Sequence, residues 1–263
     1  MINNEKYEHR LVAFIYLLGF KELVSTFETK PSEFQRTLKI LKALDEQKQM
    51  VYGFPEDLDV QMEYTTFSDS IVLSSRIPED PVNTSLYQIA FACSLLLESG
   101  LFVRGAIVDG FLYHKNNIIL GQGMIDAYTQ ESTKAIYPRI IVSSNIIDRY
   151  FKEIETSPLK EKIQSWSNTL IRKDIDGHHY LDTLQSIPSS MFKDGFIPFL
   201  KATKKIVINK LEEHKRNEKV FQKYEWFRKY YNAILSEHPE HNLDLIPKID
   251  KKSGDTLLIN QDI

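Results

Sequence analysis

The sequence predicts an α+β fold of the ferredoxin-like kind, in which helices pack on one face of an antiparallel-rich sheet. An almost unbroken apolar run, Leu11 to Leu18, is ended by Gly19 and followed by helical patterning. Two hairpin patterns and a last short strand come later, separated by helical segments. The expected order is therefore strand, helix, helix, hairpin, helix, hairpin, helix, strand, followed by a mostly helical extension.

The first strand and the turn after it define the start of the fold. An apolar run of this length is typical of a central strand that is covered on both faces. Gly19 lets the backbone turn sharply before a helix that opens at Phe20, and the unpaired N–H groups of such a turn suit a phosphate. A second helix is expected from Pro31 to about Gln49, with proline at its first position.

A hairpin with a carboxylate at its tip is expected between Tyr64 and Ser75. Phe67 and the apolar residues 71–73 favour strands, whereas Ser-Asp-Ser at 68–70 is typical of a turn. Asp69 would stand at the tip between two hydroxyls, where a carboxylate can hold a hard cation. On this stretch alone, a solvated turn aspartate is the more common alternative.

The middle of the chain predicts a helix, a second hairpin, another helix and a strand. The first helix covers about Thr84 to Ser99, and the hairpin runs from Leu101 to His114 with Asp109-Gly110 as its turn. A break follows at residues 115–117, then a helix over 123–135 and a strand over 139–143. Arg104 is the charged residue in an apolar strand, where it needs either a structural salt bridge or a bound anion.

Composition limits the classes of function. The formal net charge of -3 over 263 residues argues against a general nucleic-acid or membrane-surface role. The only cysteine, Cys93, cannot form an internal disulfide, and the apolar run ending at Phe20 has about half the length of a membrane helix. We expect no metal site among the seven histidines, because they show no HExxH-type ligand spacing. We therefore expect a cytoplasmic protein without a membrane or nucleic-acid partner.

The character of the sequence changes after about residue 144. We expect a first domain over 9–145, an extension of hairpin and helices over 146–240, and a loosely held tail over 241–263. Asp176-Gly177 predicts the turn of the hairpin in the extension. Residues 197–235 predict a long helical region.

Several stretches together resemble a known family. They are VAFIYLLGFKE at 12–22, FSDSIVLS at 67–74, and LFVRGAIVDG, LGQG, AYTQES and AIYPRI between 101 and 140. In this order and spacing they are similar to the class III nucleotide cyclases, and more closely to the bacterial pyrimidine cyclases of the Pycsar anti-phage systems. RKDIDG at 172–177 and KYEWFRKYYN at 223–232 resemble the extension of that family.

The resemblance implies an enzyme that converts UTP or CTP to a 3′,5′-cyclic nucleotide and pyrophosphate. The product would be an anti-phage signal that acts on a separate effector. Two divalent cations, Mn²⁺ or Mg²⁺, would neutralise phosphate charge and help to deprotonate the attacking hydroxyl. Active sites would lie between the protomers of a homodimer.

The resemblance also implies roles for individual residues. Asp69 matches the second metal-binding aspartate, Tyr16 stands where the first is expected, and the backbone of Leu17 would complete the metal site. Asp69 and Arg104 would be catalytic. The expected substrate-binding residues are Phe14, Leu18, Gly19, Phe20, Thr65 and Arg139.

The tyrosine at position 16 is also compatible with a second function. A tyrosine is neutral near pH 7, bulky and a poor magnesium ligand, so the chain would alternatively be an inactive nucleotide-binding or dimerising relative. A third reading, an RNA-binding sheet, would need exposed aromatic residues on central strands and a basic face. Phe102 and Phe111 are its best candidates, and the net charge disfavours it.

Overall fold

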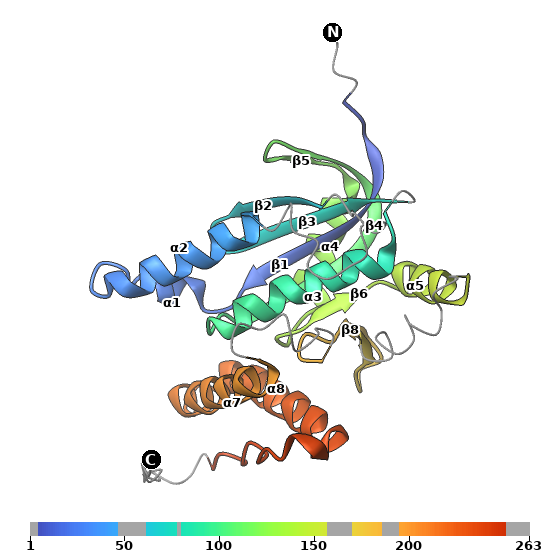
Figure 1. Ribbon diagram of the computed structural model, residues 1–263. Helices are drawn as coiled ribbons and strands as arrows, with labels where there is room; N and C mark the ends of the chain where they lie inside the picture. Colours follow the sequence, from blue (N-terminus) through green and yellow to red (C-terminus); the bar gives the residue numbers. More distant parts are fainter. Residues whose placement is uncertain (1–4, 47–61, 78–79, 157–169, 186–194, 251–263) are drawn as a thin grey trace.

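The computed structural model describes residues 5–46, 62–77, 80–156, 170–185 and 195–250 (Figure 1). The strands of the described chain are β1 (Glu8–Leu17), β2 (Glu63–Phe67), β3 (Ser70–Arg76), β4 (Val103–Lys115), β5 (Ile118–Leu120), β6 (Ile140–Val142), β7 (Ile171–Lys173) and β8 (His179–Leu181). Its helices are α1 (Phe20–Val24), α2 (Pro31–Glu46), α3 (Val82–Glu98), α4 (Gln122–Lys134), α5 (Ser144–Thr156), α7 (Phe196–Glu213), α8 (Glu218–Glu237) and the 3₁₀ helix η4 (Pro239–His241).

The strands form one mixed sheet in the order β2-β3-β1-β4-β6-β8-β7, and β5 pairs with β4. The pairs among β2, β3, β1 and β4 are antiparallel, and β6 runs parallel to β4. This is the strand order of the ferredoxin-like plan, which confirms the predicted α+β fold. The C-terminal hairpin β7–β8 joins the same sheet by pairing with β6.

The central strand β1 is buried on both faces, as its apolar run predicts. Its odd-numbered residues, such as Leu11 and Ile15, belong to a core shared with α3 and α5. Val12 and Phe14 face the opposite side, where they pack against Ala127 of α4. Figure 1 shows α3 and α4 on opposite faces of the sheet. The expectation that the helices share one face is therefore wrong for α4, because the even-numbered residues of β1 also need an apolar cover.

The predicted turn at Asp109-Gly110 is also wrong. β4 continues without a break through both residues, and the turn to β5 is made by Asn116 and Asn117, whose φ angles are 51° and 65°. Gly110 is explained by packing instead, since a Cβ atom there would lie 2.7 Å from the Cα of Gly123 on α4. The glycine pair lets this helix lie close to the strand.

The C-terminal region forms a second apolar core. The expected long helical region is divided into α7 and α8, and Asn217 caps α8 by accepting a hydrogen bond from the N–H of Val220. Phe102, which directly precedes β4, packs with its ring 5.0 Å from that of Phe227 of α8. Ile246 is buried, and its backbone bonds with Asn232. The described part of the expected tail, residues 241–250, is therefore packed through this residue, and residues 251–263 lie outside the described residues.

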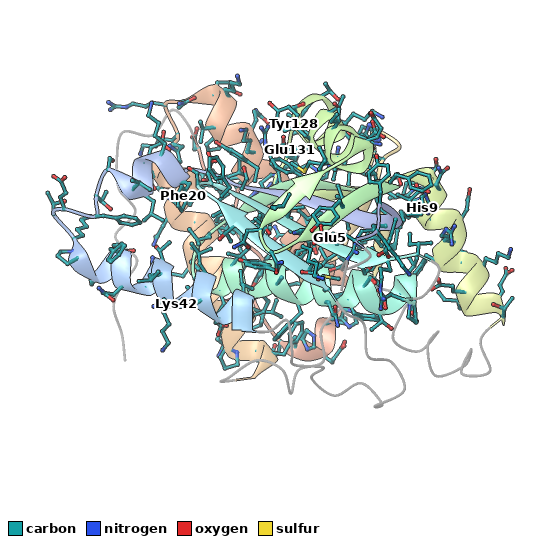
Figure 2. All side chains as sticks on the ribbon, turned by 90° about the horizontal axis from the view of Figure 1, so that it is seen from above. Glu5, His9, Phe20, Lys42, Tyr128 and Glu131 are labelled. Carbon is teal, nitrogen blue, oxygen red and sulfur yellow. The ribbon has the colours of Figure 1, made fainter. Side chains whose placement is uncertain are left out.

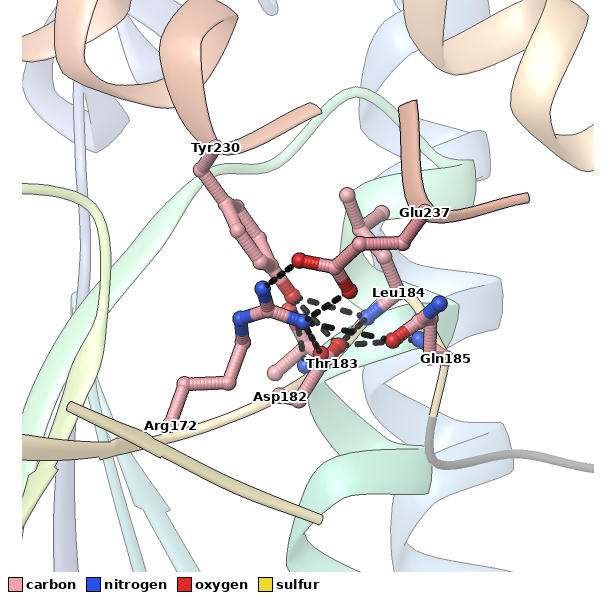
Figure 3. Close-up of polar contacts among 7 residues, drawn as sticks. All are labelled: Arg172, Asp182, Thr183, Leu184, Gln185, Tyr230 and Glu237. Atoms are coloured by element: carbon pink, nitrogen blue, oxygen red, sulfur yellow. Dashed lines mark hydrogen bonds and ion pairs between the residues drawn. The ribbon is translucent and has the colours of Figure 1, made fainter. Parts of the chain in front are cut away.

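Figure 3 shows the polar network that joins the C-terminal hairpin to α8. The hydroxyl of Tyr230 donates to the buried carboxylate of Asp182 at 2.6 Å and accepts from the N–H groups of Thr183 and Leu184. Arg172 of β7 pairs with Asp182 and with Glu237 at the end of α8. The hairpin and the helix are thus held by charge-assisted hydrogen bonds as well as by apolar contacts.

Candidate functional site

The C-terminal end of β1 brings three of the predicted site residues together. Tyr16 lies opposite Ser70 of β3 on one side and opposite Arg104 of β4 on the other. Asp69 lies in the turn between β2 and β3, and its carbonyl accepts a 2.8 Å hydrogen bond from the N–H of Leu17. The turn is tight because Ser68 adopts a left-handed conformation with φ of 55°.

The side chain of Tyr16 interacts electrostatically with that of Asp69. Partial burial raises the pKa of Tyr16, and the negative charge of Asp69 raises it further. The phenol therefore stays protonated and uncharged at neutral pH.

Arg104 forms a structural ion pair, one of the two outcomes that its strand position allows. Its Nε lies 2.6 Å from the Oε1 of Glu131 on α4, and the Glu131 side chain is only 2% exposed. The guanidinium carbon also lies 5.1 Å from the centroid of the Tyr16 ring. Figure 2 shows Glu131 and Tyr128 on the same helix. Arg104 is thus shared between a carboxylate and an aromatic face.

Glu131 is a site residue that the sequence analysis missed. It follows Met124 and Ala127 at the spacing of the buried face of α4, so a charged residue on an inward-facing position was the available signal. Burial raises the pKa of Glu131, and the charge of Arg104 opposes that shift. Lys223 of α8 also acts on Glu131 electrostatically, and burial lowers the pKa of Lys223.

Arg104→Met is expected to make stability strongly pH-dependent. Without the cation, the folded-state pKa of Glu131 rises further above its unfolded value, so the folded state binds the proton more tightly. The free energy of unfolding should then fall as pH rises from the unfolded pKa through the folded pKa, with a loss of about 2 kcal/mol at pH 7.

Urea denaturation at pH 5 and pH 7.5 measures this effect. The double variant Arg104→Met/Glu131→Gln, which has no buried acid at this position, should lose the added pH dependence. Equal losses for Arg104→Met at both pH values would contradict this explanation.

The turn at Gly19 offers fewer free backbone N–H groups for binding a phosphate than the sequence predicts. The N–H groups of Leu17 and Leu18 donate to the carbonyls of Asp69 and Phe102, each at 2.8 Å. Gly19 has φ of 74° and precedes the short helix that begins at Phe20. The amides of Leu17 and Leu18 are thus part of the backbone pairing at the strand end, so a phosphate would be left with the amides that follow them.

Phe14 and Thr65 are buried on the side of the sheet that α4 covers. The ring of Phe14 meets that of Tyr128 edge-on at 5.5 Å. The Thr65 hydroxyl lies 2.9 Å from Nε2 of His114, whose Nδ1 lies 2.8 Å from the hydroxyl of Ser74. Thr65 thus belongs to a polar chain inside the protein.

Arg139 lies in a different environment, at the junction with the C-terminal region. Its side chain is 0% exposed and pairs with both Asp174 and Asp176 of the β7–β8 turn. The guanidinium lies over the rings of Tyr137 and Trp226, at 5.4 and 5.7 Å. Arg139 would reach a phosphate only after these contacts had been broken.

The donor set around Asp69 fits one divalent cation better than two. Asp69 offers a carboxylate, whereas Glu131, the acid on the other side of Tyr16, is paired with Arg104. Mg²⁺ and Mn²⁺ prefer carboxylate and water oxygens, and a neutral phenol adds little. Asp69, with the phosphates of a substrate, is therefore the residue that would hold such an ion.

The chain was compared with known proteins. No protein-family model matches it, and no match is found among curated proteins. It is similar to the guanylyl cyclase domain of the RhoGC fusion protein from the fungus Blastocladiella emersonii, with 14% identity, a TM-score of 0.39, and coverage of 66% of this chain and 95% of that one.

Two further solved structures are similar at the same level. A class III adenylyl cyclase-like ATP-binding protein from Pseudomonas aeruginosa has 10% identity and a TM-score of 0.34, with 54% of this chain and 34% of that chain covered. The catalytic core of a rhodopsin-guanylyl cyclase with converted specificity, in complex with ATPalphaS, has 17% identity and a TM-score of 0.37, with 66% and 95% covered. Such identities say nothing about the reaction of this chain.

Proposed function

We propose that the protein is a nucleotide cyclase that acts on a pyrimidine nucleoside triphosphate, UTP or CTP. The observation that carries this proposal is the position of Asp69, which is fixed by the Leu17 N–H at the end of the central strand and lies beside Tyr16, with Arg104 across from it. The order of sequence motifs that resemble the Pycsar pyrimidine cyclases supports the same role. The product would be a 3′,5′-cyclic nucleotide that signals phage infection to a separate effector.

The chemistry follows from what each side chain can do. The 3′-hydroxyl of the substrate attacks the α-phosphate, pyrophosphate leaves, and negative charge builds up on the phosphate oxygens. A divalent cation, when bound, supplies charge neutralisation and acidifies the attacking hydroxyl. Asp69 would hold that ion against the phosphates, and Arg104 would supply positive charge from the neighbouring strand.

The proposal extends to the organisation of the chain. Residues 9–145 would be the cyclase-like domain, 146–240 the extension and 241–263 the tail. The active sites would lie between two protomers of a homodimer in the cytoplasm. No helix in the described part of the chain has the length and apolar character needed to cross a membrane.

An inactive nucleotide-binding or dimerising protein is the second candidate function. Two features favour it. The uncharged phenol of Tyr16 beside Asp69 supplies no second acidic metal ligand, and the ion pair with Glu131 engages Arg104, which catalysis would require. The RNA-binding reading is weakened by Phe102, which is buried against Tyr224 and Phe227.

Turnover with each of the four ribonucleoside triphosphates and Mn²⁺, followed by mass spectrometry, tests the proposal. We expect cyclic UMP or cyclic CMP from the unaltered protein, and none from Asp69→Ala. Asp148→Ala, which removes an exposed carboxylate of α5, is the matched control and should keep full activity. Nucleotide binding without product would favour the inactive candidate. The absence of both binding and product would overturn the cyclase and the nucleotide-binding functions and leave a dimerising protein.

A further inference from the structure

Three metal-ligating side chains gather just beyond the C-terminal end of α8. One ligand atom each from His238, Glu240 and His241 lies within 4.8 Å of the other two. Nδ1 of His238 lies 2.7 Å from Oε1 of Glu240. The two imidazole rings are stacked, with centroids 5.4 Å apart and an angle of 18° between their planes.

The backbone explains why these side chains meet. Pro239 follows His238 and begins the 3₁₀ helix η4, which ends where Asn242 takes a left-handed φ of 48°. A 3₁₀ helix has three residues per turn, so side chains three positions apart lie directly above one another. His238 and His241 are related in this way, and the N–H of His241 donates to the carbonyl of His238 at 3.1 Å.

Neighbouring groups hold this cluster in place. The ring of His241 packs edge-on against that of Phe196, the first residue of α7, at 5.3 Å. The preceding residue, Glu237, is fixed by its ion pair with Arg172. The cluster also lies at the carbonyl end of a 20-residue helix, where the macrodipole favours a cation.

We propose that His238, Glu240 and His241 form a site for a divalent transition metal of the zinc class. Two imidazole nitrogens and one carboxylate oxygen are a donor set suited to Zn²⁺, Ni²⁺ or Cu²⁺, whereas Mg²⁺ prefers oxygen ligands alone. The side chains are half-exposed to exposed, so water can complete the coordination. This site is separate from Asp69, and the proposal does not depend on the cyclase reaction.

A bound ion would stabilise the C-terminal region. It would join η4 to the end of α8, and through the His241–Phe196 contact it would also restrain the start of α7. An ion that binds the folded state and not the unfolded one raises stability by mass action. The expected role is therefore that of a clamp on the extension rather than of a catalytic centre.

The test uses the full chain after treatment with a chelator. Zn²⁺ is titrated in competition with a chromogenic chelator, and thermal unfolding is followed with and without the metal. We expect saturable binding of one equivalent and a rise in Tm of about 5 °C at a hundredfold excess over Kd. Co²⁺ in place of Zn²⁺ should give the visible spectrum of a nitrogen- and oxygen-ligated ion, and Mg²⁺ should not compete.

Variants locate the binding. His238→Gln and His241→Gln should each weaken Zn²⁺ binding by at least about tenfold, since even the loss of an outer-shell partner has that effect. His214→Gln is the matched control, because His214 also lies next to a glutamate, 3.6 Å from Glu213, and should bind Zn²⁺ unchanged. Binding that is unaffected in both ligand variants, or absent from the unaltered protein, would overturn the site.

Discussion

Replacing Arg139 with methionine is expected to lower the free energy of unfolding by about 3–5 kcal/mol, because it removes a fully buried guanidinium that pairs with two partly exposed aspartates. The substitution keeps an apolar stem and removes the guanidinium. Asp174 and Asp176 would then lose their shared cation, and the stacking of the guanidinium on Trp226 would be lost. Denaturation by urea, followed by tryptophan fluorescence and circular dichroism, measures the change.

Arg36→Met is the matched control for this prediction. Arg36 pairs with Glu33 at 2.6 Å on α2, but its side chain is 55% exposed. An exposed pair of this kind contributes about 0–1 kcal/mol, so the control should unfold almost as the unaltered protein does. Similar small losses in both variants would mean that Arg139 is not the electrostatic anchor of the C-terminal hairpin.

Tyr16→Asp is expected to raise cyclase turnover by about a hundredfold or more, a change of about 2.7 kcal/mol or more in the activation barrier. The new carboxylate would face Asp69 and supply the second acidic group that a pair of divalent cations requires. It would also replace an uncharged phenol, whose pKa burial and the charge of Asp69 now raise. Arg104 would exchange its contact with the aromatic ring for a carboxylate.

Initial rates with Mn²⁺ and UTP or CTP measure the effect of this substitution. Tyr16→Asn has nearly the same size as Tyr16→Asp but no charge, so it separates the loss of the phenol from the gain of the carboxylate. Asparagine should give much less activity than aspartate. If Tyr16→Asp is no faster than Tyr16→Asn, the missing carboxylate is not what limits this site.

The sequence predicted those elements of the fold whose signal lies within one short segment of the chain. The apolar run of β1 indicated a strand covered on both faces, and Asp176-Gly177 marked the turn between β7 and β8. The same dipeptide signal failed at Asp109-Gly110. Gly110 is required instead by the close packing of α4, which begins twelve residues later in the sequence. A side chain at Gly110 would clash with Gly123 of that helix.

In the candidate site, too, contacts between residues far apart in the sequence were not predicted. Asp69 was identified because it matches an aspartate in the motifs of the family that the sequence resembles, and Arg104 because a charge is unusual in an apolar strand. The partners that determine their state were not found, because Glu131 lies 27 residues from Arg104 along the chain and no local pattern joins them. Likewise, Arg139 has its partners 35 and 37 residues downstream, in a hairpin whose place in the sheet could not be predicted.

The addition of β8 and β7 to the sheet has a consequence for solubility. Without them the sheet would end on β6, three buried aliphatic residues with an unpaired row of backbone groups, which is a template for pairing between molecules. With them it ends on β7, three residues long and carrying Arg172 and Lys173, as a protected edge would. β8 therefore covers the edge of β6, and we expect a chain that ended near residue 145 to self-associate through β6.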